Sequence, residues 1–259
     1  MIAGAFFALA IGSLWLQRVA FTPSTSSAVA SSVIGDEQIR DQIATVIASA
    51  DGPVLGYSPE RLREFVVEIS RIPDGAALMS RFLHDGHAVL IGEADGPVTI
   101  TAAEQVLIVR DERVGEVDEL TVPIREVGSV AFLNDWLGWV ALGSAGLAVV
   151  TLVAGLLLRP ERGEGTFAVG VGLAATGISV FVFGYVVPVL LLPALSDDAW
   201  MGIFAQLADH RRNATLLLAL LAVALAAVVV FGTSSRRERR QHSTPLNIAR
   251  YRDDRSWSR

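Results

Sequence analysis

The sequence predicts an α-helical membrane protein with four transmembrane helices and a small, mainly helical α+β domain outside the cytoplasm, between the first two spans. Three observations lead to this fold class: four long apolar stretches, an uneven distribution of arginine around them, and a polar segment that follows the first stretch. The apolar stretches are residues 2–21, 136–158, 167–193 and 214–232. An α-helix rises about 1.5 Å per residue, so each stretch can cross a hydrocarbon core of about 30 Å.

Composition supports this class. The mean hydropathy is +0.48 and 52% of the residues are hydrophobic, which is high for a soluble domain of this length. Cysteine is absent. We therefore expect no disulfide, no thiolate chemistry and no cysteine-based metal site.

The charges divide the chain into an anchor (1–21), an exported domain (22–135), a three-helix membrane region (136–232) and a basic tail (233–259). Residues 22–135 hold 19 acidic residues against 8 arginines, whereas residues 236–259 hold 8 arginines against 3 acidic residues. Arginine next to a span marks the cytoplasmic side. Arg159 and Arg162, between the second and third spans, and the tail therefore indicate a multi-pass protein of the plasma membrane with both termini in the cytoplasm. Arg211 and Arg212 oppose this topology but are outnumbered.

The first span admits two interpretations. Ala28-Val29-Ala30 resembles a signal-peptidase site, so a cleaved signal peptide is the alternative to an anchor. We favour the uncleaved anchor because the apolar run ends well before that site.

Small residues recur along the second and third spans at intervals that suit helix packing in lipid. They include Gly138, Gly143 and Gly146 in the second span and Gly170, Gly172, Gly177 and Gly184 in the third. A glycine-lined substrate path is the alternative, but such a path requires polar groups inside the membrane. Those present are few: Ser144, Thr151, Thr176, Ser179 and Tyr185. Pro188 predicts a kink in the third span, and Trp136, Trp139 and Trp200 predict an aromatic belt.

Apolar periodicity predicts the elements of the exported domain. Helices are expected over residues 36–49, from Pro59 onward, over 76–91 and over 102–110, and short strands over 96–100 and 120–127. Ser58 is a suitable N-cap for the second helix. Two segments are expected to end helices in this domain: Asp51-Gly52-Pro53 and Pro73-Asp74-Gly75.

Three segments of the exported block carry a resemblance. They are the segment after the first span (residues 22–43), a later helix (80–91) and a short Gly-Pro-Val-Thr-Ile strand (96–100). In sequence and layout they resemble a widespread group of actinobacterial integral membrane proteins, although the helical middle of the exported block is shorter here. The use of arginine for all 21 basic residues suits the same GC-rich origin. The resemblance implies one anchor, one exported domain and three closing spans, and no catalytic residues.

Two clusters are candidate metal sites. His84-Asp85-Gly86-His87, with Glu93 or Asp95, could ligate zinc, but histidine ligands on one helix usually stand four residues apart rather than three. A polar helix face is the favoured interpretation. A second cluster of carboxylates does not have the calcium-loop spacing and reads as a solvated face; its members are Asp111, Glu112, Glu116, Asp118 and Glu119.

The sequence predicts no catalytic, cofactor-binding or metal-binding residue, and no nucleic-acid partner. Arg236–Arg240 would contact anionic lipid, and Ser243-Thr244-Pro245 is a possible kinase substrate. We expect a non-enzymatic accessory or scaffold subunit of the cell envelope, with the lipid bilayer and a membrane or envelope protein as partners. The alternatives are an extracytoplasmic ligand sensor, which requires convergent polar groups, and a transporter or channel component.

Overall fold

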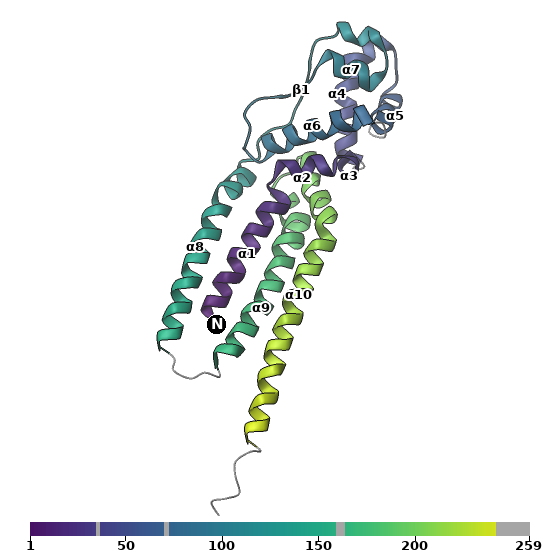
Figure 1. Cartoon of the computed structure of the whole chain (residues 1–259). Coiled ribbons are helices and arrows are strands. Elements are labelled where there is room, and N and C mark those ends of the chain that lie inside the picture. The colour runs from purple at the N-terminus through teal and green to yellow at the C-terminus, as the bar shows by residue number, and fades with distance from the viewer. Residues whose placement is uncertain (35–36, 70–72, 159–163, 242–259) are drawn as a thin grey trace, which may run out of the picture.

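The structure is a computed structural model that describes residues 1–34, 37–69, 73–158 and 164–241. It is an elongated bundle of helices with a compact segment, residues 22–127, at one end (Figure 1). We call this segment the head. Within the described residues, four helical segments are long and apolar enough to cross a membrane.

The spans are α1 (Ile2–Ala20), α8 (Gly128–Leu158), α9 (Glu164–Phe181) with its π-helical continuation η2 (Val182–Leu191), and α10 (Gly202–Gln241). They form a row in the order α8, α1, α9, α10, because α1 packs against both α8 and α9, and α9 packs against α10. The N-terminus and the far end of α10 lie at the end of the bundle away from the head. The wide helical turns of η2 contain Pro188, so the expected kink takes the form of a π-helical segment.

Two spans begin earlier than the apolar stretches. α8 begins at Gly128 rather than at residue 136, and α10 begins at Gly202 rather than at residue 214. The additional turns of α10 are buried beneath the head, where Ile203, Phe204 and Leu207 are almost inaccessible. Hydropathy does not mark these turns as part of a span because charged residues follow them at Asp209, Arg211 and Arg212.

The head contains six α-helices, one 3-10 helix and two strands among its described residues. The helices are α2 (Pro23–Ala28), α3 (Ala30–Ile34), α4 (Glu37–Leu55), α5 (Pro59–Ile69), α6 (Pro73–Leu90), α7 (Ala102–Val109) and η1 (Glu112–Glu116). The strands β1 (Val98–Ile100) and β2 (Leu120–Val122) pair antiparallel, with Val98 opposite Val122. The order of elements expected from periodicity is therefore present.

Local chemistry explains several boundaries. The Ser58 hydroxyl accepts a hydrogen bond from the Arg61 N–H at 3.4 Å, as its expected N-cap role requires. Thr101 and Glu104 form a capping box at the start of α7, in which the Thr101 N–H donates to the Glu104 carboxylate at 2.9 Å. The buried Gln105 side chain then donates to the carbonyls of Ile100 and Asp118, which ties β1 to the segment before β2.

The expected positions of two helix breaks are wrong. α4 continues through Asp51-Gly52-Pro53 and ends at Leu55. The residue that follows, Gly56, has φ 69°, a left-handed conformation that ends helices and that glycine adopts at little cost. Pro73 begins α6 instead of preceding it, because proline is tolerated in the first helical turn, where its missing N–H removes no intrahelical bond.

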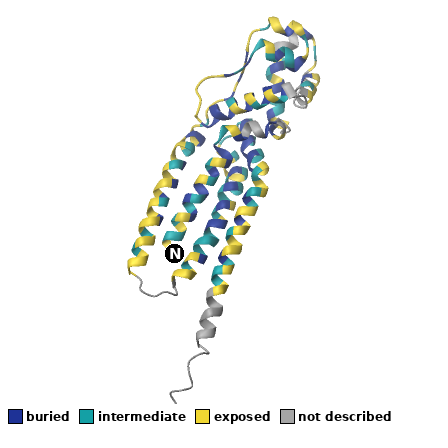
Figure 2. Ribbon diagram, viewed as in Figure 1, coloured by how far each residue is buried: buried dark blue, intermediate teal, exposed yellow. Residues whose placement is uncertain are grey.

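The buried apolar residues of the head and of the adjoining bundle end form one continuous cluster (Figure 2). Trp200 lies in this cluster, 1% exposed, with its ring centroid 5.7 Å from that of Phe82 on α6. The expectation that Trp200 belongs to an aromatic belt is therefore wrong, since the indole packs between the head and the bundle. Trp136 and Trp139 are exposed on α8, as belt residues would be.

Candidate functional site

The head meets the bundle where α6 crosses the ends of α1 and α10 (Figure 1). His87, near the end of α6, is 1% exposed at this junction. Its Nε2 lies 2.9 Å from the carbonyl oxygen of Ala20, the last residue of α1, and its ring packs edge-on against Phe204 of α10. One side chain thus contacts both helices that end beneath the head.

Burial controls the protonation of His87. Desolvation lowers the pKa of His87 to about 4, against the opposing effect of the hydrogen bond to Ala20. The imidazole is neutral at physiological pH, so Nε2 carries the proton and donates it to the Ala20 carbonyl. Nδ1 has no hydrogen-bond partner among the described residues.

The two histidines weighed as zinc ligands have different surroundings. His84 is exposed, whereas His87 is enclosed between α1 and α10, so His87 does not lie on a polar helix face as expected. Within the part of the chain that the structure describes, no three histidine, cysteine or acidic side chains are grouped closely enough to hold a metal ion. Glu93 and Asp95 follow the end of α6 and are exposed.

The end of α6 determines where Glu93 lies. Gly92 has φ 76°, and a Cβ there would come within 2.8 Å of the Ala131 methyl group, so the turn requires glycine. The Glu93 N–H donates to the Ala88 carbonyl at 2.8 Å and reverses the chain. The Asn134 amide on α8 is 3.4 Å from the Glu93 carboxylate, which brings this carboxylate over the bundle end.

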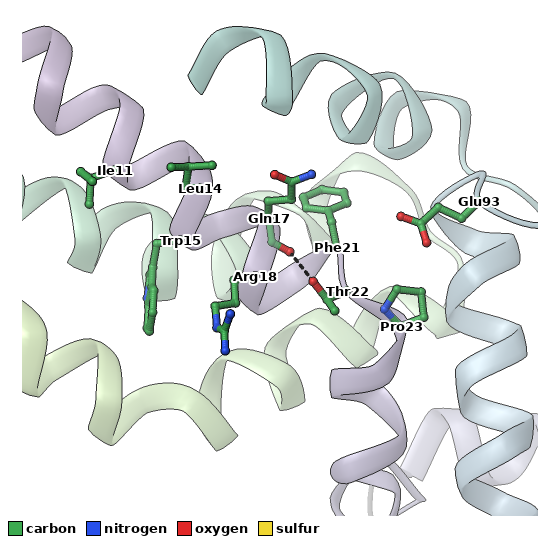
Figure 3. Close-up of a pocket in the computed structure, with 9 residues that line it drawn as sticks. All are labelled: Ile11, Leu14, Trp15, Gln17, Arg18, Phe21, Thr22, Pro23 and Glu93. Carbon is green, nitrogen blue, oxygen red and sulfur yellow. Dashed lines mark hydrogen bonds between the residues drawn. The ribbon is translucent and has the colours of Figure 1, made fainter. Parts of the chain in front are cut away.

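Glu93 stands between two hollows at the junction. The first has a volume of about 620 Å³ and lies along α1, with Ile11, Leu14, Trp15 and Arg18 among its lining residues (Figure 3). In the figure, Trp15 and Arg18 point the same way from α1. This hollow is apolar along the span and becomes charged toward the head.

The second hollow, also of about 620 Å³, lies between α6 and the segment leading into β1. Its polar lining includes Arg81, His84, Asp85 and Asp95. Thr22, Pro23 and Glu93 line both hollows, so the two adjoin at these residues, and we refer to them together as the groove. Arg81 is already ion-paired with Glu104, which joins α6 to α7.

The acidic residues considered for calcium do not converge on one point. Asp111 caps η1: its carboxylate accepts from the Arg113 backbone N–H at 3.1 Å and from the Arg113 guanidinium at 2.6 Å. The hydrogen bonds from Arg113 lower the pKa of Asp111. This carboxylate therefore has a local structural partner.

Glycines in the third span lie at close helix contacts. A Cβ at Gly177 would approach the Ala219 carbonyl oxygen of α10 to 2.8 Å, and one at Gly170 would meet Val230 at 2.6 Å. On the other face, a Cβ at Gly172 would lie 3.2 Å from the Gly4 Cα of α1. A Cβ at Gly184 would clash with the Trp15 indole. The prediction that these glycines serve helix packing is confirmed.

Glycines in the second span behave differently. Nothing described lies within 4 Å of a Cβ built at Gly138, Gly143 or Gly146. Among the described elements, α8 packs extensively only against α1. In the apolar part of α8 the buried residues are Leu137, Ala141, Ser144 and Ala148, spaced four, three and four apart. The prediction that the α8 glycines serve helix packing is therefore not met by any described helix of this chain, and it stays a prediction for contact with another protein.

Several polar groups inside the described spans form hydrogen bonds within the bundle. Thr151 and Thr176 donate to carbonyls one turn earlier, Leu147 at 2.6 Å and Gly172 at 2.9 Å. The Trp15 indole N–H donates to the Thr215 hydroxyl at 3.1 Å and joins α1 to α10. Among the other polar span residues, Ser144 is buried toward α1 and Tyr185 stacks on Phe181.

Some expected sites lie outside the described residues: Arg159, Arg162 and Ser243-Thr244-Pro245. Only the backbone of Arg236–Arg240 is described, as part of α10. Comparisons with known protein families, with curated proteins and with solved structures find no match to this chain.

Sequence reasoning identified neither the groove nor the Trp15–Thr215 contact. Arg18 carried a usable signal, since it is the only charge inside an apolar stretch and such charges mark functional positions. The spacing of Gly4, Ala8 and Gly12 carried another, because small residues four apart predict a close helix contact. Glu93 had no comparable signal, because only the fold brings it beside α1.

Proposed function

We propose that this chain is a non-enzymatic accessory or scaffold subunit of the cell envelope, which binds a membrane partner through α8 and presents its head to a further envelope protein. The observation that carries the proposal is the contrast between the glycines of α8 and those of α9. Gly170, Gly172 and Gly177 of α9 each meet a neighbouring helix, whereas no described atom lies within 4 Å of a Cβ built at the α8 glycines, which are Gly138, Gly143 and Gly146. A transmembrane helix of another subunit is the occupant that would use backbone exposed in this way.

The position of α8 supports this role. It stands at the end of the row and, among the described helices, touches the bundle extensively only through α1, so most of its described surface is available to a partner. Trp139, Leu142 and Val150 are among its exposed large side chains. A partner helix packed at the glycines would contact these side chains as well.

A transporter or channel receives less support. The close contacts of α1, α9 and α10 at Gly4, Gly172 and Gly177 leave no room for a solute between these helices. Thr151 and Thr176 bond to carbonyls of their own helices, and the Trp15 indole bonds to Thr215, so these polar groups are used within the bundle. A sensor is the second candidate, and the groove of convergent polar groups at the junction favours it.

For topology we propose the head outside and both termini in the cytoplasm of the plasma membrane. The acidic head and the arginine-rich tail support this orientation. Single cysteines can be placed at Thr121, which is exposed on β2, and at Ser243 in this cysteine-free chain. An impermeant thiol reagent applied to intact cells should label position 121 and spare position 243; the opposite pattern would reverse the orientation.

The packing of α1 supports a retained anchor. α1 lies inside the row between α8 and α9, and Val29 and Ala30 of the possible cleavage site are buried in the core. The N-terminal sequence of the protein isolated from membranes should therefore begin upstream of residue 22. A protein that begins after Ala30 would contradict the anchor.

The partner proposal is tested with Gly143→Leu, purified from native membranes in mild detergent. We expect the variant to retain its own thermal stability and to lose the subunits that co-purify with the unaltered chain. Ala224→Leu, at an exposed position of α10, is the matched control and should keep those subunits. Equal recovery of the complex from Gly143→Leu and Ala224→Leu would reject α8 as the docking helix.

A further inference from the structure

The groove at the head–bundle junction changes character along its length. Ile11, Leu14 and Trp15 line it on the bundle side, Arg18 follows one turn later, and Glu93 forms the boundary with the polar hollow of the head. Ile11 and Arg18 are separated by about 10 Å along the helix axis at about 1.5 Å per residue. An apolar surface of that length next to charged groups matches the upper part of an acyl chain and its headgroup.

Arg18 supplies a cation without a partner. It is exposed in the last turn of α1, and its backbone carbonyl accepts a hydrogen bond from the Thr25 hydroxyl. Its guanidinium has no ion pair or side-chain hydrogen bond with the described residues. Guanidinium binds phosphate oxygens through paired N–H donors, so a phosphate is the group this position fits best.

Carboxylates dominate the other end of the groove. Glu93 is shared by both hollows, and Asp85 and Asp95 line the second. A headgroup with only negative charge would bring its charge toward these acids. A primary ammonium would instead donate hydrogen bonds to Glu93, which a quaternary ammonium does not have the N–H groups to do.

We propose that this groove binds a membrane lipid with a zwitterionic phosphoethanolamine headgroup. Arg18 binds the phosphate, Glu93 accepts hydrogen bonds from the ammonium, and the acyl chain lies along Ile11, Leu14 and Trp15. The assignment depends neither on the partner proposed for α8 nor on which side of the membrane the head occupies.

The test uses the full chain, purified in mild detergent and stripped of lipid. Binding is followed by native mass spectrometry and by the rise in Tm with added lipid, since a ligand that binds the folded state stabilises it by an amount that increases with the ratio of its concentration to its Kd. Phosphatidylethanolamine should bind about tenfold more tightly than phosphatidylcholine or phosphatidylglycerol, which corresponds to about 1.4 kcal/mol. Equal binding of the three lipids would overturn the proposal.

Two variants assign the roles. Arg18→Gln should weaken binding of phosphatidylethanolamine about tenfold, and Glu93→Gln should abolish its preference over phosphatidylcholine. Glu93 is exposed, so its variant keeps the test informative if Arg18→Gln does not fold. Arg212→Gln is the matched control: Arg212 is an exposed arginine of α10, lies over the Tyr185 ring and does not line the groove. A loss of binding in Arg212→Gln equal to that in Arg18→Gln would reject the site.

Free phosphoethanolamine distinguishes a lipid from a soluble ligand. It has the same charged groups but no acyl chain, so we expect no measurable rise in Tm at concentrations where the lipid saturates. Saturation by the free headgroup at those concentrations would place the occupant in solution and overturn the lipid assignment.

Discussion

α8 and α9 have similar glycine content and hydropathy but opposite uses for their glycines. In α9, Gly170 and Gly177 meet α10 while Gly172 meets α1, so the helix is enclosed on two sides. In α8, the face that packs against α1 is built from Ala141, Ser144 and Ala148, and the glycines are left to the surroundings. Glycine in an apolar helix therefore indicates a close approach, but the approaching helix need not belong to the same chain.

The largest effect should come from filling a contact in α9. Gly177→Leu would place a branched side chain against the Ala219 carbonyl oxygen and Val223, both on α10. Overpacking of this kind costs about 3 kcal/mol when the backbone has to move. We expect little folded protein in mild detergent and a Tm lowered by many degrees, measured by size-exclusion chromatography and thermal unfolding. A variant with unaltered Tm would show that α9 and α10 are not in close contact.

The next effect concerns how the head holds α1 and α10 together. Unfolding returns the pKa of His87 from about 4 to an ordinary value near 6.5, so His87 contributes its full stability above pH 6.5 and loses it as the pH falls toward 4. At about 1.4 kcal/mol per pKa unit, the loss approaches roughly 3 kcal/mol.

Thermal unfolding of the full chain between pH 7 and pH 4 measures this loss, and His87→Gln, which does not titrate, should show a flatter profile. Identical profiles for the two proteins would mean that His87 is accessible to water in the folded state.

A smaller effect on stability is expected from the hydrogen bond between Trp15 and Thr215, which both lie against Gly184. Thr215→Val removes the acceptor of the indole N–H while keeping the shape of the side chain. Hydrogen bonds between transmembrane helices average about 0.6 kcal/mol, so we expect a loss of about that size. A double-mutant cycle with Trp15→Phe isolates the coupling between the two side chains, and a coupling near zero would contradict the contact.

The smallest effect should be that of Gly143→Leu on the isolated chain. Its side chain would enter open space on α8, so the stability should change by no more than about 0.5 kcal/mol. Thermal unfolding of Gly143→Leu beside Gly177→Leu tests the contrast between the two helices directly. A similar loss of stability in both variants would remove the distinction.

Sequence patterns predicted the spans and the order of elements in the head because both depend on local chemistry. Hydropathy identified four spans, and Ser58 with Pro59 marked the start of α5. Hydropathy could not separate the turns of α10 at Phe204 from an ordinary loop, because their burial depends on α6 lying above them. Trp200 was misplaced for the same reason: an indole at a span end looks identical whether it faces headgroups or Phe82.

The candidate site was less accessible to sequence reasoning. Arg18 could be singled out as a charge in an apolar stretch, but the hollow that it lines together with Glu93 depends on the reversal at Gly92. His84 and His87 are candidate ligands of one metal because they are close in sequence, yet His84 is exposed and His87 is buried in the folded chain. Proximity in sequence suggests both histidines as ligands, whereas the helix face on which each lies determines its surroundings.

The order of the helices in the row has a consequence for biosynthesis. α1 is made first, but its partners in α9 and α10 are made last, and Trp15 is 200 residues from Thr215. At about 5–20 residues per second, the ribosome needs roughly 10–40 s to complete that interval. During this time the surfaces at Gly4 and Gly12 have no native neighbour from the same chain, and the head must wait to close over α10. The row of helices can therefore be completed only after α10 has been made.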